Sequence, residues 1–140
     1  QRRNSMLIRA FNGRIEGNTV EESSANGISL GNETGWFYEG PFPRNITIKE
    51  NTFKNLWDPG VSLYSSTSAN APINVNFNIK ILKNTFIKDS SSPYPPAIYV
   101  SKVRGAEIKN NIFKTSSEKI LPPESAVKIY NSENIEVGQE

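Results

Sequence analysis

Short segments in which apolar and polar residues alternate recur along the chain at nearly even spacing. The first series is "GRIEGNTV" (13–20), "ITIKENTF" (46–53), "IKILKNTF" (79–86) and "AEIKNNIF" (106–113). Each holds an asparagine at the same place, at Asn18, Asn51, Asn84 and Asn111, with spacings of 33, 33 and 27 residues. Recurrence with a period of this length is typical of a repeat architecture in which each unit stacks on the next.

A second series follows the first within each repeat: "GISLGN" (27–32), "GVSLYS" (60–65), "AIYVSK" (97–102) and "AVKIYN" (126–131), and "NIEVGQE" (134–140) begins a fifth repeat. Alternation with β-branched residues and without helical periodicity predicts strands. An amphipathic helix is the alternative for the "IKENTFKNL" type of segment, but the Asn-Thr-Phe and Asn-Ile-Phe turns recur where a helix would continue.

The predicted fold is all-β: a right-handed parallel β-helix, or solenoid, of about four coils of 27–33 residues, spaced about 4.8 Å apart. The inward positions expected in the two series are Ile15, Ile46, Ile48, Ile79, Ile81, Ala106, Ile108, Ile28, Leu30, Val61, Leu63, Ile98, Val100, Val127 and Ile129. Stacking buries their apolar side chains in one continuous core.

Two further columns support this alignment. An apolar residue stands two positions after each asparagine, at Val20, Phe53, Phe86 and Phe113, and we expect these residues to stack in the interior. The asparagines fall at strand ends, where their amides can bond turn backbone and one another between coils. A structural role is therefore expected for the asparagines in preference to a catalytic one.

The long connections between strands are the expected places for function, because loops on a rigid scaffold often carry binding residues. Residues 32–45 and 65–78 are long at one corner of the coil, and residues 87–97 and 114–126 are long at the opposite corner. Residues 31–45, "GNETGWFYEGPFPRN", combine acids with aromatic residues, whereas 65–78 contain no acid.

Aromatic rings beside carboxylates are suited to a sugar, since rings stack on its C–H faces and acids bond its hydroxyls. The candidate catalytic residues are Glu33 and Glu39, and the candidate substrate-binding residues are Trp36, Tyr38, Trp57, Asp58 and Tyr64. Plainer roles stand beside these. The aromatics of 36–38 can cover the core at a wide corner, Asp58 can form the "DPG" turn, and Tyr64 can be an ordinary strand residue.

Composition narrows the chemistry. The 140 residues fit one domain, 1–140, expected to begin and end within a coil as a fragment of a longer helix, with possible end-to-end self-association. The absence of Cys and His removes disulfides, thiolate chemistry and histidine acid–base catalysis. We expect no metal and no cofactor. A net charge of +2 without a basic cluster predicts no nucleic-acid partner, and no apolar run approaches the roughly 18 residues of a membrane span.

The segment "GISLGNETGWFYEGPFPRNITIKENTF", preceded by "LIRAFNGRIEGNTV", resembles the β-helix core of the bacterial α-1,3-galactosidases of glycoside hydrolase family 110. The resemblance places Glu33 and Glu39 at the family's two acidic positions and Trp36 and Tyr38 at its aromatic positions. Glu33 replaces an expected Asp. The resemblance implies inverting hydrolysis of a terminal α-galactoside, an oligosaccharide or polysaccharide substrate, and a secreted or periplasmic bacterial protein.

Three function classes follow. The first is a glycoside hydrolase, which for inversion needs two carboxyl groups about 6.5–9.5 Å apart. Glu33 and Glu39 lie six residues apart in one loop, so the sequence permits this distance without enforcing it. The second is a polysaccharide lyase, which typically needs clustered carboxylates for Ca²⁺. The third is a non-catalytic module that binds glycans or forms a rigid rod.

Overall fold

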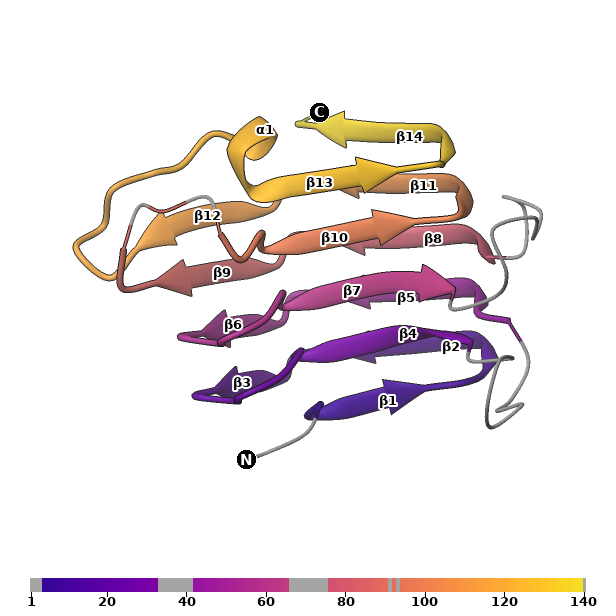
Figure 1. Ribbon diagram of the computed structural model, residues 1–140, viewed down its shortest axis with the longest axis horizontal. Coiled ribbons are helices and arrows are strands. Elements are labelled where there is room, and N and C mark those ends of the chain that lie inside the picture. Colours follow the sequence, from indigo (N-terminus) through magenta and orange to yellow (C-terminus); the bar gives the residue numbers. More distant parts are fainter. Residues whose placement is uncertain (1–3, 33–41, 66–75, 91, 93, 140) are drawn as a thin grey trace.

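The computed structural model describes residues 4–32, 42–65, 76–90, 92 and 94–139, which wind into a parallel β-solenoid (Figure 1). The first sheet has the strand order β1 (Met6–Ile8), β4 (Ile28–Asn32), β7 (Val61–Ser65), β10 (Ile98–Ser101) and β13 (Val127–Tyr130). The second has β2 (Phe11–Glu16), β5 (Arg44–Lys49), β8 (Asn76–Leu82), β11 (Val103–Lys109) and β14 (Glu133–Gly138). The third has β3 (Thr19–Glu21), β6 (Thr52–Lys54), β9 (Thr85–Lys88) and β12 (Ile112–Thr115).

Every strand pairs in parallel with its counterpart one coil away, and the predicted repeats align in register, as in Ile46 with Ile79 and Ile48 with Ile81. In Figure 1 the first sheet faces the viewer and its strands point one way, while the other two sheets lie behind it and point back. Since the chain climbs from β1 to β14 with this rotation, the coil is right-handed, as predicted. The one described helix, α1 (Pro123–Ala126), lies in the last long corner, and no described helix is long and apolar enough to span a membrane.

The core consists of the inward side chains of the three sheets, and the sequence predicts nearly all of them. Thirteen of the fifteen predicted inward positions are buried. The other two lie on edge strands: Ile15 on β2 is partly buried, and Ile129 on β13 remains 40% exposed although it is in register with the buried Val100. An edge strand has a coil on one side alone in the described part of the chain, so these two residues keep contact with solvent, although Val127 of β13 is buried.

A stack of three phenylalanines, Phe53, Phe86 and Phe113, fills the corner of the interior next to the third sheet. Their ring centroids lie 4.9 and 5.2 Å apart, with interplanar angles of 14° and 19°. Gly60 lies against this phenylalanine stack, because a Cβ atom there would come within 2.7 Å of the Phe86 ring. Stacking at these distances is favourable for aromatic rings and confirms the predicted column.

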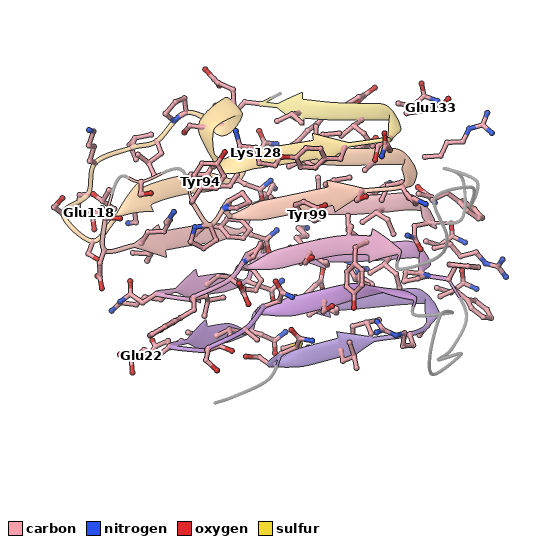
Figure 2. All side chains as sticks on the ribbon, in the orientation of Figure 1. Glu22, Tyr94, Tyr99, Glu118, Lys128 and Glu133 are labelled. Carbon is pink, nitrogen blue, oxygen red and sulfur yellow. The ribbon has the colours of Figure 1, made fainter. Side chains whose placement is uncertain are left out.

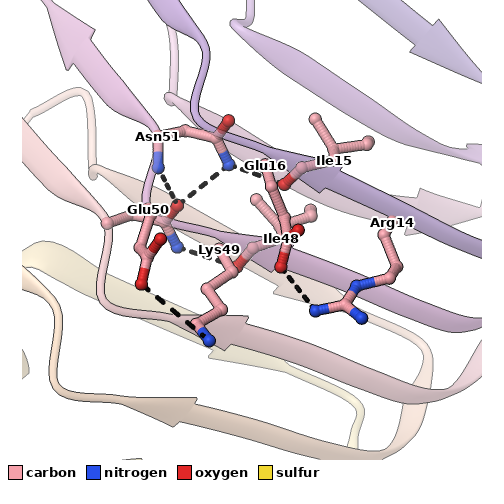
Figure 3. A network of polar contacts seen from close by, with 8 residues as sticks. Arg14, Ile15, Glu16, Ile48, Lys49, Glu50 and Asn51 are labelled. Carbon is pink, nitrogen blue, oxygen red and sulfur yellow. Dashed lines mark hydrogen bonds and ion pairs between the residues drawn. The ribbon is translucent and has the colours of Figure 1, made fainter.

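The four repeat asparagines form an inner asparagine ladder: Asn18, Asn51, Asn84 and Asn111. The Oδ1 atom of each later member accepts hydrogen bonds from the backbone N–H and the Nδ2 of the member before it, at 2.9 and 3.1 Å. Each Nδ2 from Asn51 onward also donates to a carbonyl of the preceding coil, as Asn51 does to Ile15 at 2.9 Å (Figure 3). The ladder satisfies buried amides and joins successive coils, which confirms its predicted structural role.

A second asparagine column, the outer asparagine ladder, lies at the start of the second sheet and was not predicted. The Nδ2 of Asn45 donates to Asn12 at 2.8 Å, and that of Asn78 donates to Asn45 at 2.7 Å. All three residues have φ between 53° and 59°, a left-handed conformation that asparagine tolerates better than most residues. Gly105, with φ of 82°, takes the corresponding place in the next coil. These residues turn the chain at the corner between the first two sheets.

Candidate functional site

Residues 33–41, which we call the acidic loop, follow the end of β4 in the sequence. Glu33, Trp36, Tyr38 and Glu39 lie outside the described residues, so their roles stay predictions. The strand before them, β4, ends at Asn32, which pairs in register with Ser65 at the end of β7. Residues 33–41 and 66–75 therefore both follow the carboxyl edge of the first sheet.

Tyr64 lies beside this edge. It is half-buried near the end of β7 and pairs with Gly31 of β4. A Cβ atom at Gly31 would approach the Tyr64 carbonyl oxygen to 2.3 Å and the Tyr64 ring to 3.1 Å. Glycine at position 31 therefore leaves room for the Tyr64 ring next to the point where the acidic loop begins. Of the predicted substrate-binding residues in the described part, Tyr64 is the one that the fold places at this edge.

Trp57 and Asp58 lie at the other end of the same strand, in the corner between β6 and β7. Both are exposed, Trp57 to 77%, and the backbone N–H of Trp57 donates to the Ser23 carbonyl at 3.1 Å. Tyr64 lies three residues beyond Val61, the first residue of β7, which at about 3.3 Å per residue is about 10 Å along the strand, whereas Trp57 precedes the strand. The structure therefore brings Tyr64, and not Trp57 or Asp58, to the edge where residues 33–41 begin.

The outer face of the first sheet carries aromatic residues on its later strands (Figure 2). The rings of Tyr99 and Tyr130 lie 5.5 Å apart, and the Lys128 ammonium lies 5.8 Å from the centre of the Tyr94 ring. Tyr99 pairs in register with Lys128 on the next strand. Tyr94, Lys128 and Tyr130 were not predicted as members of this surface, although aligning the outward residues of the second repeat series places Lys128 and Tyr130 beside Tyr99.

An open groove of about 470 Å³ follows the corner between the third and first sheets. Six of its lining residues, Glu22, Asn55, Trp57, Lys88, Asp89 and Tyr94, define what we call the corner groove. Burial lowers the pKa of Lys88, whose ammonium donates to the carbonyls of Ser92 at 2.6 Å and Pro95 at 2.9 Å. Within the described ranges, no group of three or more Asp, Glu, His or Cys side chains is placed to hold a metal ion.

Together these features define a parallel β-solenoid with aromatic and acidic residues on its outer faces. The chain is 27% identical over 126 residues to alpha-1,3-galactosidase A of Bacteroides thetaiotaomicron. The match covers 89% of this chain and 22% of the relative, so the chain spans about a fifth of that protein's length. No family model matches the chain. The similarity supports a relationship to a glycoside hydrolase.

Proposed function

We propose that this chain is the β-solenoid segment of a glycoside hydrolase that removes a terminal α-linked galactose-type residue from a glycan. The observation that carries the proposal is the similarity to a named galactosidase along 89% of the chain. The placement of Tyr64 beside the edge where residues 33–41 begin adds support, because it sets an aromatic ring next to the segment with the candidate acids.

In the proposed reaction, Glu33 and Glu39 are the two carboxyl groups of an inverting mechanism. One protonates the glycosidic oxygen, and the other, as a carboxylate, takes a proton from the water that attacks the opposite face of the sugar ring. Trp36 and Tyr38 would support the sugar by stacking. No cofactor is part of this scheme, since both proton transfers use side-chain carboxyl groups.

Replacement of one acid tests the proposal. Glu39→Gln keeps the size of the side chain and removes its ability to exchange a proton, so hydrolysis of a nitrophenyl α-galactoside should fall by at least about 100-fold. The melting temperature should stay within a degree or two of that of the unmodified protein, because Gln has nearly the same size and shape as Glu. Glu21→Gln, an exposed acid on β3, is the matched control and should keep full activity. Full activity of Glu39→Gln would refute the role of this residue.

A module that binds glycans without cleaving them is the second candidate function. The exposure of Trp57 and Tyr94, to 77% and 66%, favours it, because large aromatic side chains exposed together in a groove are common at binding sites. Measurable oligosaccharide binding without release of a monosaccharide, by the unmodified protein, would establish this function in place of the first. A polysaccharide lyase would instead be recognised by the absorbance of an unsaturated product formed from uronic-acid polymers.

A further inference from the structure

The corner groove is assembled from three successive coils, at the end of the first sheet opposite the edge where residues 33–41 begin. Glu22 follows β3, Asn55 and Trp57 follow β6, and Lys88 ends β9. Asp89 and Tyr94 belong to the connection between β9 and β10. Because each coil contributes to the same corner, residues more than 60 positions apart in the sequence line one groove, with Glu22 near the third sheet and Tyr94 near the start of β10 (Figure 2).

Backbone hydrogen bonds between coils fix the first two walls of the groove. The N–H of Glu22 donates to the Lys54 carbonyl at 3.0 Å, and the N–H of Asn55 donates to the Ile87 carbonyl at 2.9 Å. Both residues are left-handed, with φ of 51° and 53°, and thereby turn the chain outward at equivalent corners. The backbone N–H of Trp57 donates to the Ser23 carbonyl of the preceding coil. The backbone that carries the exposed indole is therefore held in place.

The third wall is held by Lys88. Its ammonium bonds the carbonyls of Ser92 and Pro95, on either side of Tyr94, and the Tyr94 N–H donates to the Ser92 hydroxyl at 3.3 Å. The Tyr94 ring is nevertheless 66% exposed. A partly buried ammonium thus holds the backbone on both sides of Tyr94, whose aromatic side chain remains available at the surface, and such preorganisation lowers the entropic cost of binding.

The polar groups of the groove complement the two rings. One oxygen of Asp89 accepts a hydrogen bond from the Ser116 hydroxyl at 2.7 Å, which orients the carboxylate, and the Glu22 carboxylate has no hydrogen-bond partner among the described residues. Carboxylates accept hydrogen bonds from sugar hydroxyls, while indole and phenol rings pack on the C–H faces of a sugar. The lining has two carboxylates and one ammonium, and that ammonium is already committed to two carbonyls. A second ammonium, that of Lys128, lies outside the lining, 5.8 Å from the centre of the Tyr94 ring.

We propose that the corner groove, with Trp57 and Tyr94 as stacking surfaces and Glu22 and Asp89 as hydrogen-bond acceptors, is a second glycan-binding site that favours neutral hexoses over uronic acids. It lies at the opposite end of β7 from the edge where residues 33–41 begin, so it would hold a distant part of the glycan and not the bond that is cleaved. The sugar class, a galactose-containing neutral glycan, rests on the proposed function. The site itself rests on the geometry of the groove.

Trp57 itself can report binding. The chain has two tryptophans, Trp36 and Trp57, so Trp36→Phe leaves Trp57 as the one indole of the protein. Titration of this variant with the neutral disaccharide Galα1-3Gal should shift the Trp57 emission in a saturable manner. Calorimetry on the same sample establishes the concentration at which the disaccharide is saturating. No change in Trp57 emission at that concentration would overturn the proposal.

Variants of the groove should then weaken binding. Trp57→Ala and Tyr94→Ala should each raise the calorimetric Kd for the disaccharide at this site by about tenfold, the loss usual for an aromatic residue central to an interface. Phe77→Ala, an aromatic residue 39% exposed on the second sheet, is the matched control and should leave the Kd unchanged. Unchanged affinity in both groove variants would refute the site.

Digalacturonate should bind at least about tenfold more weakly than the neutral disaccharide, and equal affinity would refute the preference.

The outcome for this site is separable from that for the proposed function. The double variant Trp36→Phe/Glu39→Gln should lose hydrolysis and still give the saturable Trp57 signal, since position 39 is not part of the groove. A Trp57 signal in a protein that cleaves no galactoside would refute the hydrolase and leave the groove. Cleavage of the galactoside without any change in Trp57 emission would refute the second binding site and leave the proposed hydrolase function unaffected.

Discussion

The interior corner of the solenoid and the corner groove outside it lie on the same coils but follow opposite rules. Inside, the same residue types recur at each level: the phenylalanine stack and the inner asparagine ladder repeat with spacings of 33 and 27 residues. Outside, the equivalent corner positions are Glu22, Asn55 and Lys88, which share neither charge nor shape. Stacking thus constrains the inward residues, whereas the outward residues are open to selection for function.

The physical reason for this difference is the number of neighbours that each position serves. The buried Asn84 side chain makes hydrogen bonds to Asn51 and Ile48 of one neighbouring coil and to Asn111 of the other. A substitution at position 84 therefore removes contacts with both coils. The Trp57 side chain is 77% exposed and has no side-chain hydrogen bond among the described residues. The comparison therefore predicts large losses of stability for inward substitutions and losses of binding for outward ones.

Phe86→Ala should have the largest effect on stability. Phe86 is the middle ring of the phenylalanine stack, and its loss leaves a cavity between Phe53 and Phe113. The free energy of unfolding should fall by about 3–5 kcal/mol, the usual range for removing a buried aromatic ring. Urea denaturation followed by circular dichroism measures this value. A loss below about 1 kcal/mol would contradict the assignment of the stack as the main packing element of this corner.

Asn84→Ala should come next. The substitution removes the acceptor of two hydrogen bonds from Asn51 and the donor to the Ile48 carbonyl, all in a buried setting. Since each buried polar group left unpaired costs about 1–3 kcal/mol, we expect a loss of about 3 kcal/mol in the same urea experiment.

The outer asparagine ladder supplies the matched control for Asn84. Asn78→Gly also removes an inter-coil amide bond, but the site is exposed, and glycine suits its left-handed backbone, as Gly105 shows one coil later. A loss of at most about 1 kcal/mol is expected, because water replaces the lost partner. Equal losses in the two variants would show that burial does not distinguish the two ladders.

Trp57→Ala should have the smallest effect on stability. With most of the indole already in solvent, the free energy of unfolding should change by no more than about 0.5 kcal/mol, in contrast to the tenfold loss of glycan affinity proposed above. A loss of 2 kcal/mol or more in urea denaturation would mean that Trp57 covers the core instead of serving the groove.

The sequence was sufficient to predict the fold because the aligned repeats place the buried residues of successive coils in the same columns. The strands, their parallel registers, the right-handed coil and the columns of phenylalanine and asparagine follow from aligning a few short segments. The exceptions are physical as well: Ile15 and Ile129 have the right pattern, but edge strands do not bury them fully. The outer asparagine ladder was missed because its members lie near the start of the second-sheet strands, where a left-handed residue interrupts the alternation.

The candidate site was less predictable, because outward residues do not repeat. Tyr64 lies at the edge where residues 33–41 begin, and its role in binding stays a prediction, whereas Trp57 and Asp58 lie at the other end of β7. Tyr94 and Asp89 were not predicted as partners of Trp57, since the three meet only after a full coil has closed. Closeness along a solenoid depends on the place within the coil more than on separation in sequence.

The stereochemistry of cleavage tests the central proposal most directly. Proton NMR of the anomeric signals, recorded during hydrolysis of Galα1-3Gal by the unmodified protein, identifies the first anomer of galactose released. Inversion by two carboxyl groups predicts that β-galactose appears first and that α-galactose follows by mutarotation. Initial release of α-galactose, or no release of galactose at all, would contradict the account.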